Sequence, residues 1–459
     1  MSPEDELPVR SAGWKPAGAT HPLRRAAELA EEHLDGLGER RVGAITTYED
    51  TVAALDEPLP ATGSDPVAVI EHLASVAGPA TVASPGPRYF GFVTGGALPA
   101  ALAADWLASA WDQNAFSRVS SPAATAIEAV TERWVLEALA LPPTASVGFT
   151  TGATMANFTG MAAARHAVLR RAGHDVERDG LAGAPRIRVL AGTHVHASML
   201  VALRYAGLGA PELVPAEELA AAIGDGPTIV CAQAGEVNTG AVDPLGAIAD
   251  AARQHGAWLH VDGAFGLWAA ASPRLRRLVA GAERADSWAV DAHKWLNVPY
   301  DGAMAIVADR AAVRAAIGVT AAYIPADDGR EPIDLSPEMS RRARAIPVYA
   351  ALRQLGRDGL AELVDRCCAL AERLAAAMDE LDGAEVLNEV VLNQVLVRFG
   401  DDDATTRAVI EDVQRSGEAW LGGTVWEGRA AARVSVSNWS TTEEDIDRLA
   451  AAFGRSLRG

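Results

Sequence analysis

A lysine at residue 294 is the strongest chemical signal in the sequence. It lies in Asp291-Ala-His-Lys294-Trp, directly after the apolar run 288–290, which predicts a buried strand. A lysine at a strand end among apolar neighbours can lose its proton and attack a carbonyl carbon. An isolated lysine is more commonly a solvated surface group. The chemical interpretation therefore depends on the residues that accompany it.

An aspartate follows another predicted strand upstream of this lysine. It lies in His260-Val-Asp262-Gly-Ala264-Phe. A carboxylate there could keep the ring nitrogen of a pyridine cofactor protonated, which makes the ring an electron acceptor. An aspartate that caps a helix or a turn is the alternative, since such caps are common after strands. The lysine downstream favours the cofactor.

Two further polar motifs also follow predicted strands. Phe149-Thr-Thr-Gly152-Ala153-Thr154 leads into a helix, whose first backbone N–H groups could bind a phosphate. The motif lacks the lysine of a nucleotide P-loop and the GxGxxG of a dinucleotide site, and a plain helix cap is the alternative. His194 and His196 follow the next strand, where one histidine could stack on an aromatic cofactor or be a buried structural group. With no third ligand at a suitable spacing, we expect no metal.

The elements that position these motifs alternate between short apolar runs and helical patterns. The predicted strands cover residues 147–149, 187–190, 228–232, 258–261, 288–290 and 303–307. This alternation predicts an α/β fold, a mostly parallel sheet with helices on both faces and ligands at the carboxyl ends of the strands. We expect a helical N-terminal arm over 1–85, a large domain over 86–338 and a small α+β domain over 339–459.

Composition restricts the partners. The formal net charge is -20 and is spread along the chain, which disfavours nucleic acid and anionic membranes as partners. Cys231, Cys367 and Cys368 do not form a disulfide framework or a zinc motif. The acidic start lacks the pattern of a signal peptide. We therefore expect a cytoplasmic protein.

In their order along the chain, the motifs resemble those of the group II pyridoxal-phosphate decarboxylases, the family of the aromatic amino acid and glutamate decarboxylases. The resemblance extends from about Arg88 to the last predicted helix. It implies fold type I of pyridoxal enzymes, pyridoxal 5'-phosphate as cofactor, and decarboxylation of an L-amino acid to the amine and CO2. It also implies a homodimer with interlocked N-terminal arms and shared active sites.

The resemblance also implies roles for individual residues. Lys294 forms the internal aldimine, Asp262 pairs with the ring nitrogen, and His196 stacks over the ring. Tyr323 protonates the substrate carbon after CO2 leaves. The further implied contacts are Ala153 and Thr154 at the phosphate, Ala264 beneath the ring, His293 at the phosphate or aldimine, Asn238 at the ring substituents, Arg433 at the substrate carboxylate, and Phe92 and Phe116 along the substrate pocket, Phe116 from the partner subunit.

The identity of the substrate depends on the side chains of the pocket. Phe92, Trp111 and Phe116 favour an aromatic substrate, because aromatic pairs gain about 0.5–1.5 kcal/mol beyond burial. An acidic substrate needs a further cation for its distal carboxylate, and Arg88 and Arg118 lie near enough in the sequence to provide one.

Several other activities are compatible with parts of the pattern. An aldehyde-forming decarboxylase would use the same site, but a loop tyrosine at 323 favours the amine as product. A transaminase or carbon–sulfur lyase leaves the family-wide match unexplained, and a scaffold protein would have lost Lys294 or Asp262. One departure from the family is Asp291, where some relatives carry asparagine. A carboxylate that faces a phosphate is unfavourable, so the contact at this position is in question.

Overall fold

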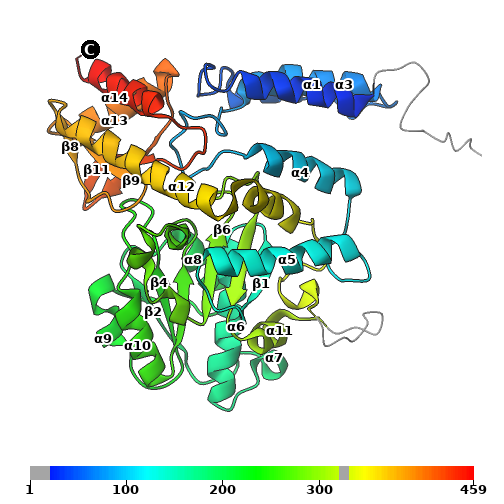
Figure 1. Ribbon diagram of the computed structural model, residues 1–459, viewed down its shortest axis with the longest axis vertical. Helices are drawn as coiled ribbons and strands as arrows, with labels where there is room; N and C mark the ends of the chain where they lie inside the picture. The colour runs from blue at the N-terminus through cyan, green and yellow to red at the C-terminus, as the bar shows by residue number, and fades with distance from the viewer. Residues whose placement is uncertain (1–20, 320–329, 459) are drawn as a thin grey trace, which may run out of the picture.

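The computed structural model describes residues 21–319 and 330–458, and a seven-stranded sheet lies at its centre (Figure 1). The strand order is β1-β7-β6-β5-β4-β2-β3. Strand β7 runs antiparallel to its neighbours β1 and β6, and the other neighbours pair in parallel. The strands are β1 (Ser146–Thr150), β2 (Arg188–Gly192), β3 (Glu212–Val214), β4 (Thr228–Gln233), β5 (Trp258–Asp262), β6 (Ser287–Asp291) and β7 (Ala303–Val307). The predicted α/β sheet is confirmed.

Helices cover both faces of this sheet, which explains why its central strands are buried along their whole length. Alternate residues of a strand point to opposite faces, so Ile229 and Cys231 of β4 pack in one apolar cluster while Val230 and Ala232 pack in the other. The helices that pack together on the first face are α6 (Ala153–Arg171), α8 (Ala197–Tyr205) and α11 (Arg310–Ile317). Helix α10 (Leu245–His255) packs on the second.

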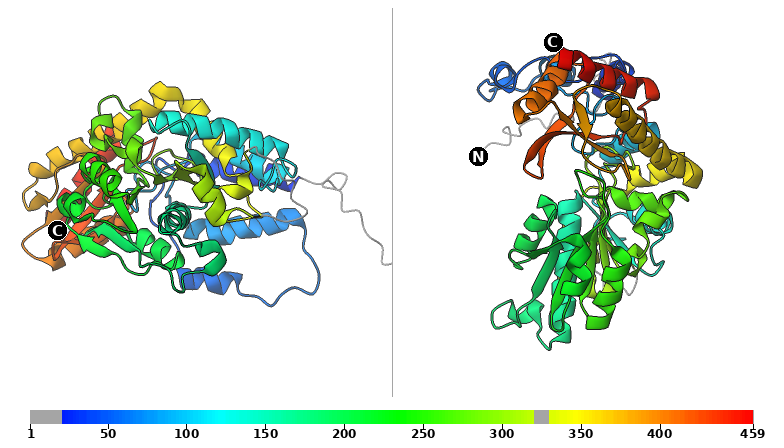
Figure 2. Two further views of the ribbon diagram at one scale, coloured as in Figure 1. Left: turned by 90° about the horizontal axis from the view of Figure 1, so that it is seen from below. Right: turned by 90° about the vertical axis from the view of Figure 1, so that its left-hand side faces the viewer.

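A smaller, antiparallel sheet of four strands follows, in the order β10-β11-β9-β8. Its strands are β8 (Ala384–Val386), β9 (Gln394–Phe399), β10 (Gly422–Trp426) and β11 (Arg429–Ser435), and its helices are α12 (Ala345–Asp379), α13 (Asp403–Ser416) and α14 (Glu443–Arg458). Figure 2 shows this sheet and its helices as a separate layer beside the larger sheet. The loops after β4 and β6 bond to it, because Thr424 donates to Asn238 and Asn297 donates to the Ser437 carbonyl.

The N-terminal helices form a layer apart from both sheets. They are α1 (Pro22–Asp35), α2 (Tyr48–Leu55) and α3 (Pro66–Ala77), and Figure 1 shows α1 and α3 side by side. None of the residues in these three helices is buried. These three helices therefore have no core of their own.

Helices α4 (Pro99–Trp111) and α5 (Pro122–Ala138) connect this arm to the large sheet and pack on α12. Helix α5 begins where the sequence places a hydroxyl before a proline. Ser121 accepts a hydrogen bond from the Ala124 N–H, and Pro122 occupies the first helical position, where no N–H is needed.

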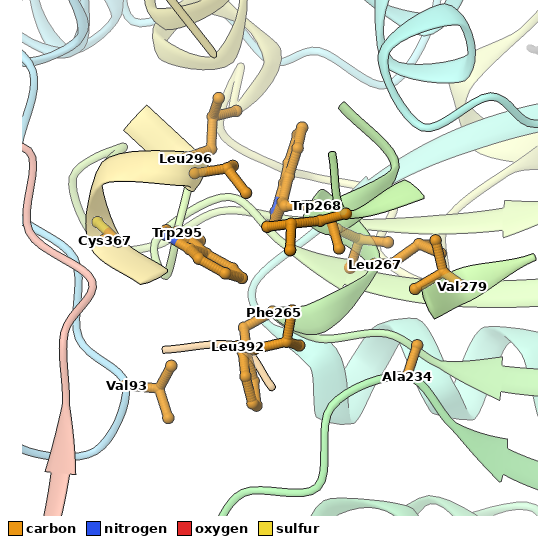
Figure 3. Packing of buried hydrophobic residues seen from close by; sticks show 14 of the residues in the cluster. Val93, Ala234, Phe265, Leu267, Trp268, Val279, Trp295, Leu296, Cys367 and Leu392 are labelled. Atoms are coloured by element: carbon orange, nitrogen blue, oxygen red, sulfur yellow. The ribbon is translucent and has the colours of Figure 1, made fainter. Parts of the chain in front are cut away.

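Tryptophan rings fill the core beside the strand that ends at residue 291. Trp268, Trp288 and Trp295 are fully buried, and Figure 3 shows Trp268 and Trp295 packed with Phe265 and Leu392. Removing such a ring typically costs about 3–5 kcal/mol of stability. Because Trp295 follows Lys294 directly, its burial fixes the backbone from which that lysine projects.

Candidate active site

Lys294 lies just beyond the carboxyl end of β6, and its amine is paired with a carboxylate. Its Nζ is 2.9 Å from Asp291 Oδ2, and its side chain is 17% exposed. Burial lowers the pKa of Lys294, but Asp291, with a smaller contribution from Asp262, raises it above its ordinary value overall. Lys294 is therefore an ammonium in this arrangement. It becomes a nucleophile only when the pair with Asp291 is broken.

The backbone of Lys294 is held by its neighbours in the fold. A Cβ on Gly95 would lie 1.9 Å from the Lys294 carbonyl oxygen, so only glycine fits at residue 95. The buried side chain of Asn297 donates to the carbonyls of Trp295 and Ser437, and it accepts from the Trp439 N–H. These contacts tie the loop after β6 to the C-terminal sheet.

Asp262 ends β5 and is 6% exposed. Its Oδ2 accepts from Asn157 Nδ2 at 2.9 Å, and its Oδ1 accepts from the Ala264 N–H at 3.2 Å. An ionised carboxylate has about four acceptor positions, so two donors leave room for a further N–H. This geometry suits a partner for a protonated ring nitrogen.

His196 caps helix α8 and lies within electrostatic range of Lys294 and Asp262. Its Nδ1 accepts from the Ser198 N–H at 3.2 Å. Burial lowers the pKa of His196, Asp262 opposes this shift, and Lys294 and Arg433 lower the pKa further. The imidazole is therefore neutral at pH 7. His194 instead lies against Trp426 of β10, with ring centroids 4.7 Å apart.

The N-terminus of α6 is already bonded to a carboxylate. The Ala153 N–H donates to Asp291 Oδ1 at 2.7 Å, and Asp291 is 2% exposed. A phosphate at this helix N-terminus would therefore compete with the Asp291 carboxylate for a backbone N–H. The carboxylate occupies the first backbone donor of the helix that Ala153 and Thr154 begin.

Ala264 and His293 both lie beside Asp291. The Ala264 carbonyl accepts from the Asp291 N–H at 2.8 Å, and His293 Nε2 is 3.5 Å from Asp291 Oδ1. His293 also stacks on Tyr300, with centroids 4.3 Å apart, and the Tyr300 hydroxyl is 3.4 Å from Thr94 Oγ1. Sequence reasoning missed Tyr300, since it lies in an irregular loop with no motif that marks it.

Arg433 of β11 carries a guanidinium without a partner. Within residues 21–319 and 330–458 it makes no hydrogen bond and no ion pair, and its Nε is buried. Burial lowers the pKa of Arg433 and Glu236 opposes that shift, while Arg433 itself lowers the pKa of His196. A half-buried guanidinium without an ion-pair partner among the described residues is unfavourable, so this position suits an anionic ligand.

The other predicted pocket residues are engaged elsewhere or lie at the surface. Asn238 donates to Glu236 Oε1 at 2.7 Å and accepts from Thr424 at 3.0 Å. Phe92 is 61% exposed, and the Phe116 carbonyl accepts from the Ile333 N–H. The roles of Asn238, Phe92 and Phe116 remain predictions. Tyr323 lies outside the described residues.

The two arginines considered for an acidic substrate have structural partners. Arg88 is 2% exposed and donates to the backbone carbonyls of Gly38, Arg40 and Glu418. Arg118 donates to Glu331 Oε1 at 2.7 Å. Arg88 would have to break these contacts to bind a distal carboxylate, whereas Arg118 uses its Nε for Glu331 and its side chain is 41% exposed.

Two polar side chains behind Asp262, Asn157 and His260, have no role predicted from the sequence. Asn157 lies four residues after Ala153 in α6, and His260 lies two residues before Asp262 in β5. Helical and strand periodicity place each on the same face as its functional neighbour, which is the signal that could have found them. Among the described residues, no group of His, Cys, Asp and Glu could hold a metal ion. No helix in these residues has the length and apolar composition to span a membrane.

Sequence comparisons show which known proteins the chain resembles. A sequence model described as the pyridoxal-dependent decarboxylase conserved domain matches residues 49–399. Tryptophan decarboxylase 1 of Oryza sativa subsp. japonica is 30% identical over 407 residues, 78% of this chain and 78% of that protein. L-2,4-diaminobutyrate decarboxylase of Rhizobium meliloti (strain 1021) is 30% identical over 389 residues, 79% of this chain and 76% of that protein. Because the chain is equally identical to these two decarboxylases, sequence identity does not indicate its substrate, which depends on the side chains of the pocket.

The fold has close relatives among solved structures. A crystal structure of Oryza sativa TDC with PLP and tryptamine matches with a TM-score of 0.88 at 24% sequence identity. The match covers 97% of this chain and 99% of that chain, so it includes both sheets and the N-terminal helices. The expected fold type I architecture is confirmed.

Proposed function

The chain belongs to the family of pyridoxal-dependent decarboxylases, and we propose that it converts an aromatic L-amino acid into its amine and CO2 at Lys294. It is a decarboxylase of amino acids, and its cofactor is pyridoxal 5'-phosphate. The aromatic substrate, the roles of the individual residues and the amine as product form the proposal.

The residues of the site fit this cofactor. When bound, it supplies a carbonyl carbon to which amines bond and a pyridine ring that accepts the electron pair left by CO2. Lys294 would hold the carbonyl carbon, and Asp262, with acceptor positions to spare, would hold the proton of the ring nitrogen. Thr154 would donate its backbone N–H to the phosphate, as would Ala153 once its bond to Asp291 is broken, and neutral His196 would lie against the ring.

The observation that carries the proposal is the guanidinium of Arg433, which lacks a partner in the described chain and lies beside His196. A substrate α-carboxylate would satisfy this cation, and hydrogen bonds to charged groups contribute about 1.5–3 kcal/mol. Arg433 would thereby fix which bond of the substrate faces the ring. Tyr323 would then donate its hydroxyl proton to the α-carbon, with His196 as the alternative acid.

An aromatic substrate is favoured over an acidic one by the arginines. Arg88 and Arg118, the cations considered for a second carboxylate, are bonded to backbone carbonyls and to Glu331. Phe92 and Trp111 expose aromatic surface, at 61% and 48%. These surfaces and the uncovered N-terminal helices support a homodimer in which Phe116 completes the partner's pocket.

A competition assay tests the function. The purified protein with cofactor receives tryptophan, tyrosine, phenylalanine, glutamate, aspartate and 2,4-diaminobutyrate together, and amines, aldehydes and CO2 are quantified. We expect one equivalent of aromatic amine for each CO2. Preference for an acidic or diamino acid would overturn the aromatic assignment, and aldehyde with ammonia would overturn the amine as product.

A further inference from the structure

A chain of buried hydrogen bonds runs from Trp258 to Asp262 through three other side chains. Trp258 Nε1 donates to Ser287 Oγ at 2.8 Å, and Ser287 Oγ lies 2.8 Å from His260 Nδ1. His260 Nε2 lies 2.9 Å from Asn157 Oδ1, and Asn157 Nδ2 donates to Asp262 Oδ2 at 2.9 Å. Ser287, His260 and Asn157 are fully buried.

The two ends of this chain determine the direction of every bond in it. The indole N–H of Trp258 can only donate, so Ser287 accepts from it and its own proton is available for His260 Nδ1. A carboxylate can only accept, so the amide of Asn157 turns its NH2 group toward Asp262 and its oxygen toward His260. Both requirements meet at His260, which must carry its proton on Nε2.

The surroundings of His260 keep it in this neutral form. Burial lowers the pKa of His260 to about 3, so the ring gains no second proton at working pH. Helix α6 makes room for the ring at Gly160, where a Cβ would lie 2.7 Å from His260 Nδ1 and Cε1. The ring is therefore held between α6 and β6 with one donor and one acceptor.

We propose that His260 is a positioning residue for the cofactor, because its Nε2–H locks the Asn157 amide with the NH2 group facing Asp262. Without that donor, the amide is free to turn its oxygen toward the carboxylate, where two acceptors repel each other. Asp262 then loses both a hydrogen bond and its fixed orientation. The inference rests on the proposed pairing of Asp262 with the ring nitrogen, and it extends that pairing to residues with no contact to substrate.

A matched pair of substitutions isolates the donor. His260→Gln offers an amide N–H near the position of Nε2, while His260→Met has a similar length and no donor. We expect His260→Met to lower kcat about tenfold with little change in KM, and His260→Gln to stay within about twofold of wild type. Equal losses in both variants would mean that the residue acts only through packing, and would overturn the proposal.

A spectroscopic measurement separates this role from the activity. Enzyme reconstituted with ring-15N-labelled pyridoxal phosphate reports by 15N NMR whether the ring nitrogen carries a proton. We expect a protonated ring in wild type and His260→Gln and a smaller protonated fraction in His260→Met. A fully protonated ring in His260→Met would overturn the proposal even if kcat fell.

The tautomer of His260 is tested without catalysis. In holoenzyme with 15N-labelled histidine, the signal lost in His260→Gln identifies His260, and we expect a neutral ring with its proton on Nε2 between pH 6 and 8. A proton on Nδ1 would overturn the directed chain. Absence of decarboxylation by the wild type would refute the proposed function instead, and would leave the tautomer result standing.

Discussion

Replacing Asp291 by asparagine removes a negative charge from the point where the N-terminus of α6 and Lys294 meet. Asp291 Oδ1 accepts from the Ala153 N–H at 2.7 Å, and Oδ2 lies 2.9 Å from Lys294 Nζ. On the proposed assignment, the cofactor phosphate needs the same N–H, and Lys294 must lose its proton before it bonds to the cofactor. Asp291→Asn should therefore bind the cofactor more tightly and faster.

The magnitude follows from the difference between a charged and a neutral acceptor. A hydrogen bond to a charged group contributes about 1.5–3 kcal/mol and a neutral one about 0.5–1.5 kcal/mol. The hydrogen bond from the Ala153 N–H to residue 291 should therefore be about 1–1.5 kcal/mol weaker with asparagine than with aspartate. The dissociation constant should fall about tenfold. The rate should rise at neutral pH, because burial lowers the pKa of Lys294 and loss of Asp291 removes the main opposing effect.

The assay mixes cofactor-free protein with pyridoxal phosphate and follows the visible absorbance of the covalent product between pH 6.5 and about 9.5. Fluorescence quenching gives the dissociation constant. Asp301→Asn is the matched control, since Asp301 lies in the same connection between β6 and β7 as Lys294 but pairs with Arg344. Weaker or slower binding by Asp291→Asn than by wild type would refute the reasoning, because Asp291 would then be a favourable ligand of the cofactor site.

Four further outcomes are expected. Lys294→Ala should lose the borohydride-reducible bond to the cofactor, whereas Lys15→Ala, the change at the other lysine of the sequence, should keep it. Arg433→Met should raise KM about tenfold to a hundredfold in steady-state assays while the cofactor absorbance stays unchanged. Tyr323→Phe should release aldehyde and ammonia in place of amine, because the unprotonated substrate carbon reacts with oxygen; unchanged amine would point to another acid. His260 stays neutral when folded, with its pKa lowered by burial to about 3, while the unfolded chain takes up a proton below about pH 6.5. Stability therefore falls as the pH drops, and His260→Gln should remove about 2 kcal/mol of that loss at pH 5, measured from urea midpoints at pH 7.5 and 5.

Much of the large sheet was predictable, because the alternation of apolar strands and amphipathic helices is a local property of the sequence. The predicted strand 303–307 coincides with β7. Its antiparallel direction was not predictable, since pairing with β1 and β6 decides it. The short strands β3 of this sheet and β10 of the smaller sheet were not among the predicted strands. Two of the three residues of β3 are exposed, and β10 alternates between half-buried and exposed residues. Neither strand therefore has a strong apolar pattern.

The functional groups of the site were also predictable from the sequence, whereas the contacts between them were not. Residue types and motif order were enough to single out Lys294, Asp262 and His196, because each stands at the end of a recognisable strand. The partners of these groups depended on the fold. Asn157 and Asp262 are 105 residues apart in the chain and meet only when α6 packs on β5. Ala153 and Asp291 are 138 residues apart and meet only when the first turn of α6 reaches the end of β6.

The sequence by itself thus determined which functional groups the protein has and which cofactor they suit, since these depend on side-chain chemistry and on short motifs. The tertiary structure alone decided that Asp291 occupies the N-terminus of α6, that Arg433 has no partner in the described chain, and that His260 supports Asp262 through Asn157. The physical reason is that hydrogen bonds and ion pairs act over a few ångströms. Which groups come that close depends on the packing of elements far apart in the chain.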